Sequence, residues 1–299
     1  MPQNSKAIRK RIRSVASTKK ITRTMEMVAT SKLQRTQGRV LQSRPYMRAM
    51  TDLMEKLSGS VEGVGLSPLF ERRSPMKRVL VFLITANRGL CGGYNSNLVR
   101  MCREHLQALR AEGLEPVLWV AGKKGIAQMR FQRIEMERTR IDLSDNPSFA
   151  EAEAVAAPML EAFLTSAVDR VDVVYADFQS ASRQPPVAQT LLPVGAKAEP
   201  ADGAAQAPQT ASDLDTFIYE PSAAEILEEL GPAYVKNLAY RMLLSAVASE
   251  QLARRAAMKA ASDNAGEMEK NLTRKYNKAR QAQITQEIAE IVGGAEALK

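Results

Sequence analysis

Two glycine-rich segments are the first places in this chain where chemistry would be sought. Residues 89–93 (GLCGG) lie between a predicted strand and a predicted helix, where phosphate-binding loops are often found. Residues 122–125 (GKKG) also follow a predicted strand, but position 117 is Val, so the P-loop pattern GxxxxGK(S/T) is not met. Neither segment matches GxGxxG, and we interpret both as tight turns.

Cysteine, histidine and acidic residues offer little more. Cys91 could act as a nucleophile only with His105, the one histidine, which lies on the following helix; a buried, inert thiol is the favoured interpretation. Cys91 and Cys102 form no CxxC pair, so neither a disulfide framework nor a zinc site is expected. Asp172 and Asp177 are interpreted as solvated or structural. We therefore expect no active site, no cofactor and no metal.

The C-terminal segment, residues 276–298 (YNKARQAQITQEIAEIVGGAEAL), is more distinctive. It carries an apolar stripe of isoleucines, continued by a valine, and a polar cluster one to two turns earlier. The stripe is Ile284, Ile288, Ile291 and Val292; the cluster is Lys278, Arg280, Gln281 and Thr285. Gly293 and Gly294 are predicted to cap the helix. An apolar stripe that no helix of this chain covers would need a sleeve formed by other subunits.

These residues belong to one of two long helices. Residues 233–292 contain no proline and one glycine, and an unbroken helix of that length would be about 90 Å long. Residues 4–44 predict a second helix, and residues 33, 40, 47, 54 and 61 are apolar at heptad spacing, which is typical of a coiled coil. Pro45 is expected to kink the helix or force it to restart.

The apolar spacing is less regular near the N-terminus. Ile21, Met25 and Val28 repeat the four-and-three spacing of Ile8, Ile12 and Val15, whereas Lys19 and Lys20 place polar residues where the seam is expected. Either the seam faces solvent for one turn there, or this turn contacts another protein.

The middle of the chain alternates strands with helices. Strands are predicted at residues 78–84, 116–121, 171–178, 187–193 and 215–219, which indicates βαβ units with a terminal β-hairpin. The predicted fold class is α/β: a long antiparallel coiled coil of the N- and C-terminal helices with an inserted Rossmann-like α/β domain. The expected divisions are residues 1–62, the N-terminal coiled-coil helix; 76–220, the inserted domain; and 222–299, the C-terminal coiled-coil helix.

The positive charge is concentrated at one end. Residues 1–50 hold 13 Lys and Arg and one acid, Glu26, whereas the whole chain has a net charge of +9. Nucleic acid, an anionic membrane surface and acidic protein partners are the three interpretations, and composition alone does not separate the first from the third. No run of about 18 apolar residues is present, so no membrane span is expected.

Three segments closely resemble the gamma subunit of F-type ATP synthases, the rotor of the central stalk. They are residues 8–50, which include IRKRIRSVASTKKITRTMEMVATSKL and SRPYMRAM; residues 87–95 (NRGLCGGYN); and residues 276–298. The resemblance runs in order along nearly the whole chain and is weakest over residues 130–215. It implies a non-catalytic shaft that couples rotation of a proton-driven c-ring to conformational cycling of catalytic beta subunits.

The resemblance also implies partners and contact residues. Three alpha and three beta subunits would surround the shaft, and the epsilon subunit and the c-ring would lie beside the inserted domain. Arg280, Gln281 and Thr285 would contact beta subunits, and Arg23, Met25 and Glu26 would oppose them. Ile288, Ile291 and Val292 would lie in an apolar sleeve.

Alternatives and location complete the expectations. A nucleic-acid-binding coiled coil, a small α/β enzyme with helical arms and a membrane-surface adaptor explain less of the sequence. The acid-free start resembles a mitochondrial transit peptide, but the helical pattern continues without a Ser-rich linker. We therefore expect a bacterial protein, peripheral on the cytoplasmic side of the inner membrane.

Overall fold

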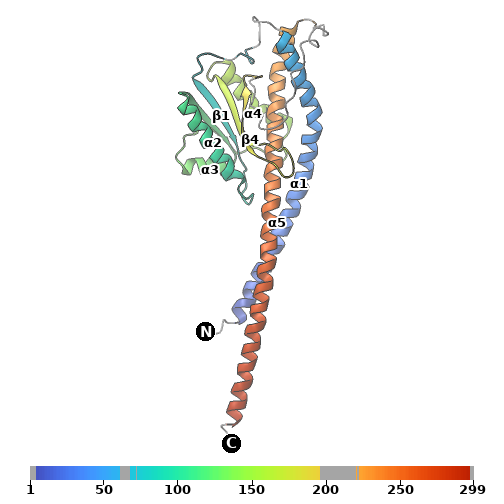
Figure 1. The fold of residues 1–299 in the computed structure, drawn as a ribbon, viewed down its shortest axis with the longest axis vertical. Helices are drawn as coiled ribbons and strands as arrows, with labels where there is room; N and C mark the ends of the chain where they lie inside the picture. The colour runs from blue at the N-terminus through green and yellow to red at the C-terminus, as the bar shows by residue number, and fades with distance from the viewer. Residues whose placement is uncertain (1–4, 61–67, 72, 196–219, 221, 297–299) are drawn as a thin grey trace. The chain divides into compact units, whose positions relative to one another are not determined.

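The computed structural model describes residues 5–60, 68–71, 73–195, 220 and 222–296 of the chain (Figure 1). The elements are α1 (Ser5–Ser60), β1 (Arg78–Ile84), α2 (Tyr94–Ala111), β2 (Glu115–Ala121), α3 (Lys123–Phe131), β3 (Arg138–Arg140), α4 (Phe149–Leu164), β4 (Arg170–Ala176), β5 (Pro186–Leu192) and α5 (Ala223–Glu296). They form two compact units, each described by itself: residues 32–253, and residues 5–31 with 254–296.

A five-stranded sheet is the centre of the larger unit. Its order is β3-β2-β1-β4-β5; the first four strands are parallel, and β5 runs antiparallel to β4. The central strands are apolar on both faces, as a sheet covered on both sides requires. The predicted alternation of strands and helices is therefore confirmed. The strand predicted at residues 215–219 lies outside the described residues.

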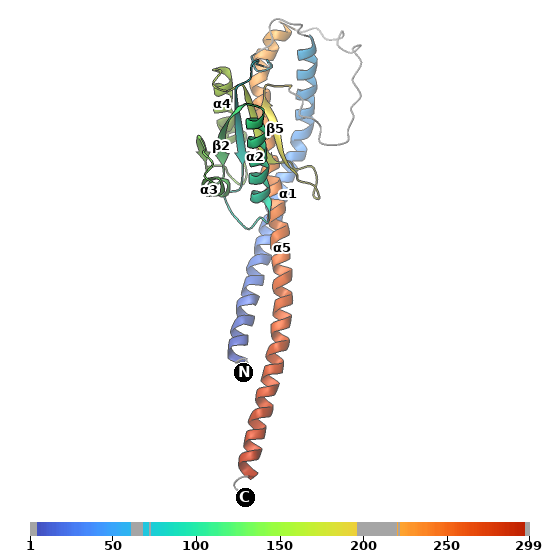
Figure 2. The ribbon, with the colours of Figure 1, turned by 60° about the vertical axis from the view of Figure 1, so that its left-hand side comes forward.

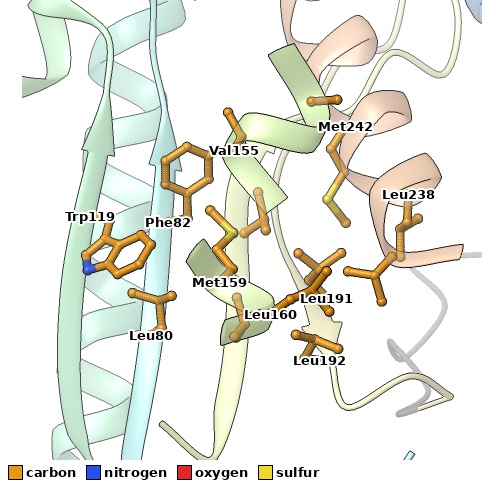
Figure 3. Close-up of a cluster of buried hydrophobic side chains, with 14 of the residues drawn as sticks. Leu80, Phe82, Trp119, Val155, Met159, Leu160, Leu191, Leu192, Leu238 and Met242 are labelled. Carbon is orange, nitrogen blue, oxygen red and sulfur yellow. The ribbon is translucent and has the colours of Figure 1, made fainter. Parts of the chain in front are cut away.

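Helices cover the two faces of the sheet (Figure 2). On one face, Val79, Val81 and Leu83 of β1 pack against α2 and α3. On the other face, side chains of β1 and β2 pack against α4 and α5, with Phe82, Met159 and Met242 in a single apolar cluster (Figure 3). Ser148 is the N-cap of α4, with a capping box in which Ser148 and Glu151 exchange hydrogen bonds. Helix α5 is thus part of the domain's core.

The same part of α5 also packs against α1. Leu33 and Val40 of α1 form a buried cluster with Leu244, Ala248 and Leu252 of α5. This segment of α5 is buried on nearly its whole circumference because the sheet covers one side and α1 the other.

Both long helices pass through a proline, Pro45 in α1 and Pro232 in α5. The restart expected at Pro45 does not occur: α1 is continuous, because Pro45 is exposed while Val40 and Met47 on either side are buried and hold the helix in place. Helix α5 begins at Ala223, one residue after the expected start of the C-terminal helix at residue 222 and ten residues before the proline-free run that starts at residue 233. Its first turns are held by Leu227, which is buried in a small cluster with α1.

Two glycine positions hold the turns at the sheet edge in place. Thr85 follows β1, donates to the Ala121 carbonyl oxygen at 2.7 Å and accepts from the Gly125 N–H at 3.0 Å. Gly122 has φ +100°, and a Cβ there would lie 2.1 Å from the Thr85 carbonyl oxygen; at Gly125 it would lie 2.4 Å from Thr85 Oγ1. Packing against Thr85 therefore explains both glycines: Gly122 is the connection between β2 and α3, and Gly125 lies in the first turn of α3, so the predicted tight turn is limited to Gly122.

A buried carboxylate joins three elements. Asp172 of β4 accepts from Arg170 Nη2 at 2.8 Å, from His105 Nε2 of α2 at 2.8 Å and from Thr190 Oγ1 of β5 at 2.9 Å. Burial alone would raise the pKa of Asp172, but the hydrogen bond from His105 and the charge and hydrogen bonds of Arg170 outweigh it and lower the pKa. The role of Asp172 is structural.

We expect Gly122→Ala to lower the free energy of unfolding by about 3 kcal/mol, because both the positive φ and the Thr85 carbonyl oppose a Cβ. Gly113→Ala is the matched control, since Gly113 has φ +79° with open space around it, and should lose only about 1 kcal/mol. Urea unfolding of both variants measures the difference, and equal losses would contradict the packing argument.

We expect Asp172→Asn to cost about 3 kcal/mol or more, because it leaves the Arg170 guanidinium without its buried counter-charge. The contribution of Asp172 is complete above the ordinary Asp pKa of about 3.9 and is lost as pH falls through the lowered native pKa. Stability against pH should therefore be flatter in the variant below about pH 4.

Asp142→Asn is the control for this comparison. Asp142 also pairs with an Arg two residues earlier, Arg140, at 2.7 Å, but its side chain is 62% exposed. The loss should stay below about 1 kcal/mol. A loss at Asp142 equal to that at Asp172 would show that burial is not what matters.

Candidate partner-contact surface on the helical pair

The smaller unit is an antiparallel pair of helical segments, residues 5–31 of α1 and 254–296 of α5. Ser5 Oγ donates to Gln283 Oε1 at 3.2 Å, and Lys19 Nζ lies 3.0 Å from Glu269 Oε2. Figures 1 and 2 both show the two segments side by side, with α5 continuing beyond the start of α1. Among the described residues, α1 therefore covers α5 only as far as Gln283.

The seam between the two segments follows one heptad phase on each helix. On α1, the seam residues Ile8, Val15, Thr22 and Ala29 recur every seven residues and are buried or half-buried. On α5 the buried positions are Met258, Ser262 and Ala265. Most of these side chains are small, so the seam is thin and the helices can approach closely.

The polar turn noticed in the sequence spans the seam. Lys19 reaches across to Glu269, and its aliphatic chain lies 3.4 Å from the Cβ that Gly266 would carry. Beside it runs a polar groove of 740 Å³, lined by Ala16, Lys19, Lys20, Arg23, Ser262, Asp263, Gly266, Glu267, Glu269 and Lys270. Lys19 thus pairs within the chain, whereas Lys20 is exposed.

The three predicted contact residues of α1 do not share a surface. Arg23 Nη1 forms an ion pair with Glu26 Oε2 at 2.8 Å; the Arg23 side chain is 62% exposed and that of Glu26 only 14%. At about 100° per residue, Met25 lies roughly 160° around the helix from Arg23. Arg23 therefore presents a cation on one flank of the pair, half-buried Met25 lies on the other, and Glu26 holds Arg23 in place.

The expectation that Ile21, Met25 and Val28 continue the seam is wrong. Ile21 is 58% exposed and Val28 is 50% exposed, while Thr22 and Ala29, each one position later, are buried. The physical reason is that the heptad phase of the pair is fixed along the whole segment, so the seam positions stay fixed even where they hold less apolar residues. Ile21, Met25 and Val28 instead form an outward-facing apolar stripe.

The predicted residues of α5 do share a surface. Arg280, Gln281 and Thr285 are exposed, and so are Ile288 (56%), Ile291 (71%) and Val292 (56%). At about 100° per residue these six residues fall within an arc of about 140°. Arg280 forms no ion pair with any described residue, and the Thr285 hydroxyl donates only to the Gln281 carbonyl, at 2.9 Å.

The apolar pattern of α5 changes phase at Gln283, which lies beside Ser5, the first residue of α1. The seam positions of α5 continue through half-buried Ala279 to Gln283, and the next positions in that phase, Gln286 and Glu290, are polar. The isoleucine stripe starts at Ile284, 47% exposed, one residue out of phase with the seam. The stripe therefore faces away from the side that α1 would occupy, and a longer α1 would not cover it.

The predicted helix cap at Gly293 and Gly294 is wrong, because α5 continues through both residues to Glu296. No atom lies within 4 Å of the Cβ that either glycine would carry, so this end of the helix is surrounded by open space. A close-fitting partner could approach the backbone there without displacing a side chain of this chain.

The loop of residues 87–95 is a structural connection. The Asn87 side chain accepts from the Lys123 N–H at 3.1 Å and donates to the Leu143 carbonyl at 3.0 Å. Cys91 is 2% exposed and accepts from Asn95 Nδ2 at 3.1 Å. Burial raises the pKa of the other thiol, Cys102, to about 12. These contacts hold the loop in place, and none of them prepares a nucleophile.

Exposed apolar residues of the helical pair that were not among the predicted contacts include Ile21, Val28 and Met27 on α1 and Met268 on α5. The sequence held a signal for the first two, because counting back in sevens from Leu33 leads to Glu26 and Lys19, and neither Ile21 nor Val28 belongs to that series.

No helix in the part of the chain that the structure describes is long and apolar enough to cross a membrane.

Known proteins resemble this chain along its whole length. The family model described as ATP synthase matches residues 4–298. An ATP synthase gamma chain of Gemmatimonas aurantiaca is 44% identical over 294 residues, covering 98% of both chains. An ATP synthase gamma chain of Leptospira biflexa is 41% identical over 291 residues, covering 97% of this chain and 98% of the relative.

Solved structures share the fold. A chain in the OSCP/F1/c-ring structure of the Euglena gracilis mitochondrial ATP synthase aligns with a TM-score of 0.65 at 20% identity, covering 98% of this chain and 94% of that one. A chain in the central stalk/c-ring structure from Tetrahymena thermophila aligns with a TM-score of 0.56 at 24% identity, covering 81% and 99%. The family match and the close relatives together show that this chain belongs to the ATP synthase gamma chain family.

Proposed function

We propose that this chain is the central rotor shaft of a proton-driven F-type ATP synthase and couples rotation of the c-ring to conformational cycling of the catalytic beta subunits. Membership of the gamma chain family supports this function. The observation that carries it is the exposed apolar stripe of α5. This stripe begins at Ile284, just beyond the residue that contacts the first turn of α1, and it faces away from the α1 side. Such a stripe suits insertion into a sleeve of other subunits.

The partners follow from the same surface. Three alpha and three beta subunits surround the shaft, and Ile288, Ile291 and Val292 contact an apolar sleeve at the closed end of their ring. Arg280, Gln281 and Thr285 make the polar contacts with beta subunits one to two turns earlier. Their exposure and their position on the same arc of α5 support this assignment.

The α1 segment gives the shaft two unlike flanks. Arg23, supported by Glu26, presents a cation on one side, and Met25 with Ile21 and Val28 presents an apolar stripe on the other. A turning shaft therefore offers each beta subunit these surfaces in succession. Each surface favours a different beta conformation, so that rotation changes nucleotide affinity.

The inserted domain, residues 76–220 between the helices at 1–62 and 222–299, contacts the epsilon subunit and the c-ring. The chain has no active site of its own and is held peripherally, through the complex, on the cytoplasmic side of a bacterial inner membrane. Packing against Thr85 accounts for the glycines at 122 and 125, and burial accounts for Cys91, which supports a non-catalytic role.

Reconstitution tests this function. Mixing the purified chain with alpha and beta subunits should give a complex with one copy per three beta subunits, with ATP hydrolysis appearing only on assembly. Size-exclusion mass and an ATPase assay measure both. A chain that stays separate and elutes with nucleic acid in a salt-dependent way would contradict the proposal.

In that assay we expect Ile288→Asp to weaken assembly at least about tenfold, since burial of an isoleucine contributes about 1.5–3 kcal/mol and a carboxylate would be desolvated. The isolated chain should unfold within about 0.5 kcal/mol of wild type because residue 288 is exposed. Gln286→Asp, in the seam phase of the same exposed segment, should assemble normally. Equal effects at 286 and 288 would contradict the sleeve contact.

Arg280→Glu should lower coupled ATP synthesis several-fold in reconstituted vesicles and do so more strongly at low salt, since exposed ion pairs are weak, about 0–1 kcal/mol, and screened. Arg280 suits this test because it has no ion pair to a described residue, whereas Arg23 is bound to Glu26. Lys275→Glu, exposed on another part of the α5 surface, is the control. Intact synthesis in Arg280→Glu would count against the beta contact.

A further inference from the structure

The inserted domain contains a cavity that the rotor function does not use. It lies at the edge of the sheet between β2, β3 and α4 and has a volume of 430 Å³, within the range of small-molecule pockets, roughly 300–1,000 Å³. It exists because β3 has only three residues and pairs with β2 only at residues 119–121. Its floor is apolar: Phe82, Trp119, Val155, Pro158 and Met159.

An unpartnered donor belongs to this floor. The Nε1 atom of Trp119 is buried and has no hydrogen-bond partner among the described residues. The side chain as a whole is 7% exposed, and Figure 3 shows the nitrogen-bearing edge of the indole turned away from Phe82. Because this nitrogen is buried, a ligand in the cavity would contact the indole ring and not its N–H.

A cation lies over the same ring. The Arg138 guanidinium is stacked 4.5 Å from the centroid of the Trp119 ring. Arg138 makes no ion pair or hydrogen bond with a described residue, whereas Arg140 is bound to Asp142 and to the Ala154 carbonyl. Stacking orients the guanidinium and leaves the hydrogen-bonding edge of Arg138 for a ligand.

We propose that this cavity binds a small amphipathic monocarboxylate. Its apolar body would lie on the floor beside Val155 and Met159, and its carboxylate would accept from the Arg138 guanidinium. One available guanidinium matches one negative charge. A cationic amphiphile would be repelled by Arg138, because Asp142, the carboxylate that lines the same cavity, is already paired with Arg140.

Trp119 is the only tryptophan in the chain, so its fluorescence reports directly on the cavity. Titration of the full chain with decanoate, below its micelle concentration, should give a saturable change in emission. The single indole N–H cross-peak in a nitrogen–proton NMR spectrum should shift as the ligand packs against the ring. No saturable change up to about 1 mM decanoate would overturn the proposal, since small ligands this weak fall below about 4 kcal/mol of binding.

Two comparisons distinguish an anion-binding site from a cavity that binds ligands through apolar contacts alone. Arg138→Gln should weaken decanoate binding about tenfold or more, while Arg103→Gln, at an exposed position on α2, should leave it unchanged. Decyltrimethylammonium, which has the same chain and the opposite charge, should not bind. Equal binding by the two arginine variants, or binding of the cationic probe as tightly as decanoate, would overturn the assignment.

Discussion

An apolar stripe on a helix is stabilised when it is covered, and among the described residues α1 reaches only as far as Gln283 of α5. The isoleucines that follow share a face that the seam phase does not use. If that segment were meant to pair with a longer α1, its apolar residues would continue the seam through Gln286 and Glu290. The change of phase therefore indicates a different kind of partner, one that takes the terminal segment on the other side.

The proposed rotation also explains why the contacts on this shaft are weak ones. Arg23 and Arg280 are exposed cations, and exposed ion pairs contribute little and break easily. A surface that slides past three neighbours must not be trapped by any of them. Strong, buried ion pairs would hold the shaft at one angle of rotation. A weak charge on one flank and the apolar stripe of Ile21 and Val28 on the other instead give a preference that changes gradually with the angle of rotation.

Much of the fold could be predicted from the sequence, because strands buried on both faces have a distinctive composition and residues 33–57 of α1 follow a strong heptad. The prediction failed where packing geometry and residue type disagree. Ile21 and Val28 are more apolar than Thr22 and Ala29, yet the seam phase buries the latter pair. The predicted site residues of α5 share one face, but Arg23 and Met25 do not. Only the burial of neighbouring residues shows which flank each one occupies.

The sheet of the inserted domain is joined to α5 by close packing. Leu238, Met242 and Ala246 of α5 belong to the same apolar cluster as side chains of the sheet. Asp172 of β4 also forms hydrogen bonds with residues of α2 and β5. A load applied to the sheet therefore reaches α5 through close-packed side chains, which deform little. On the opposite side of this segment, Leu244 and Ala248 pack on Leu33 and Val40 of α1, so this part of α1 is also held against the domain. For a shaft, this arrangement matters more than any chemistry in the loops of the sheet.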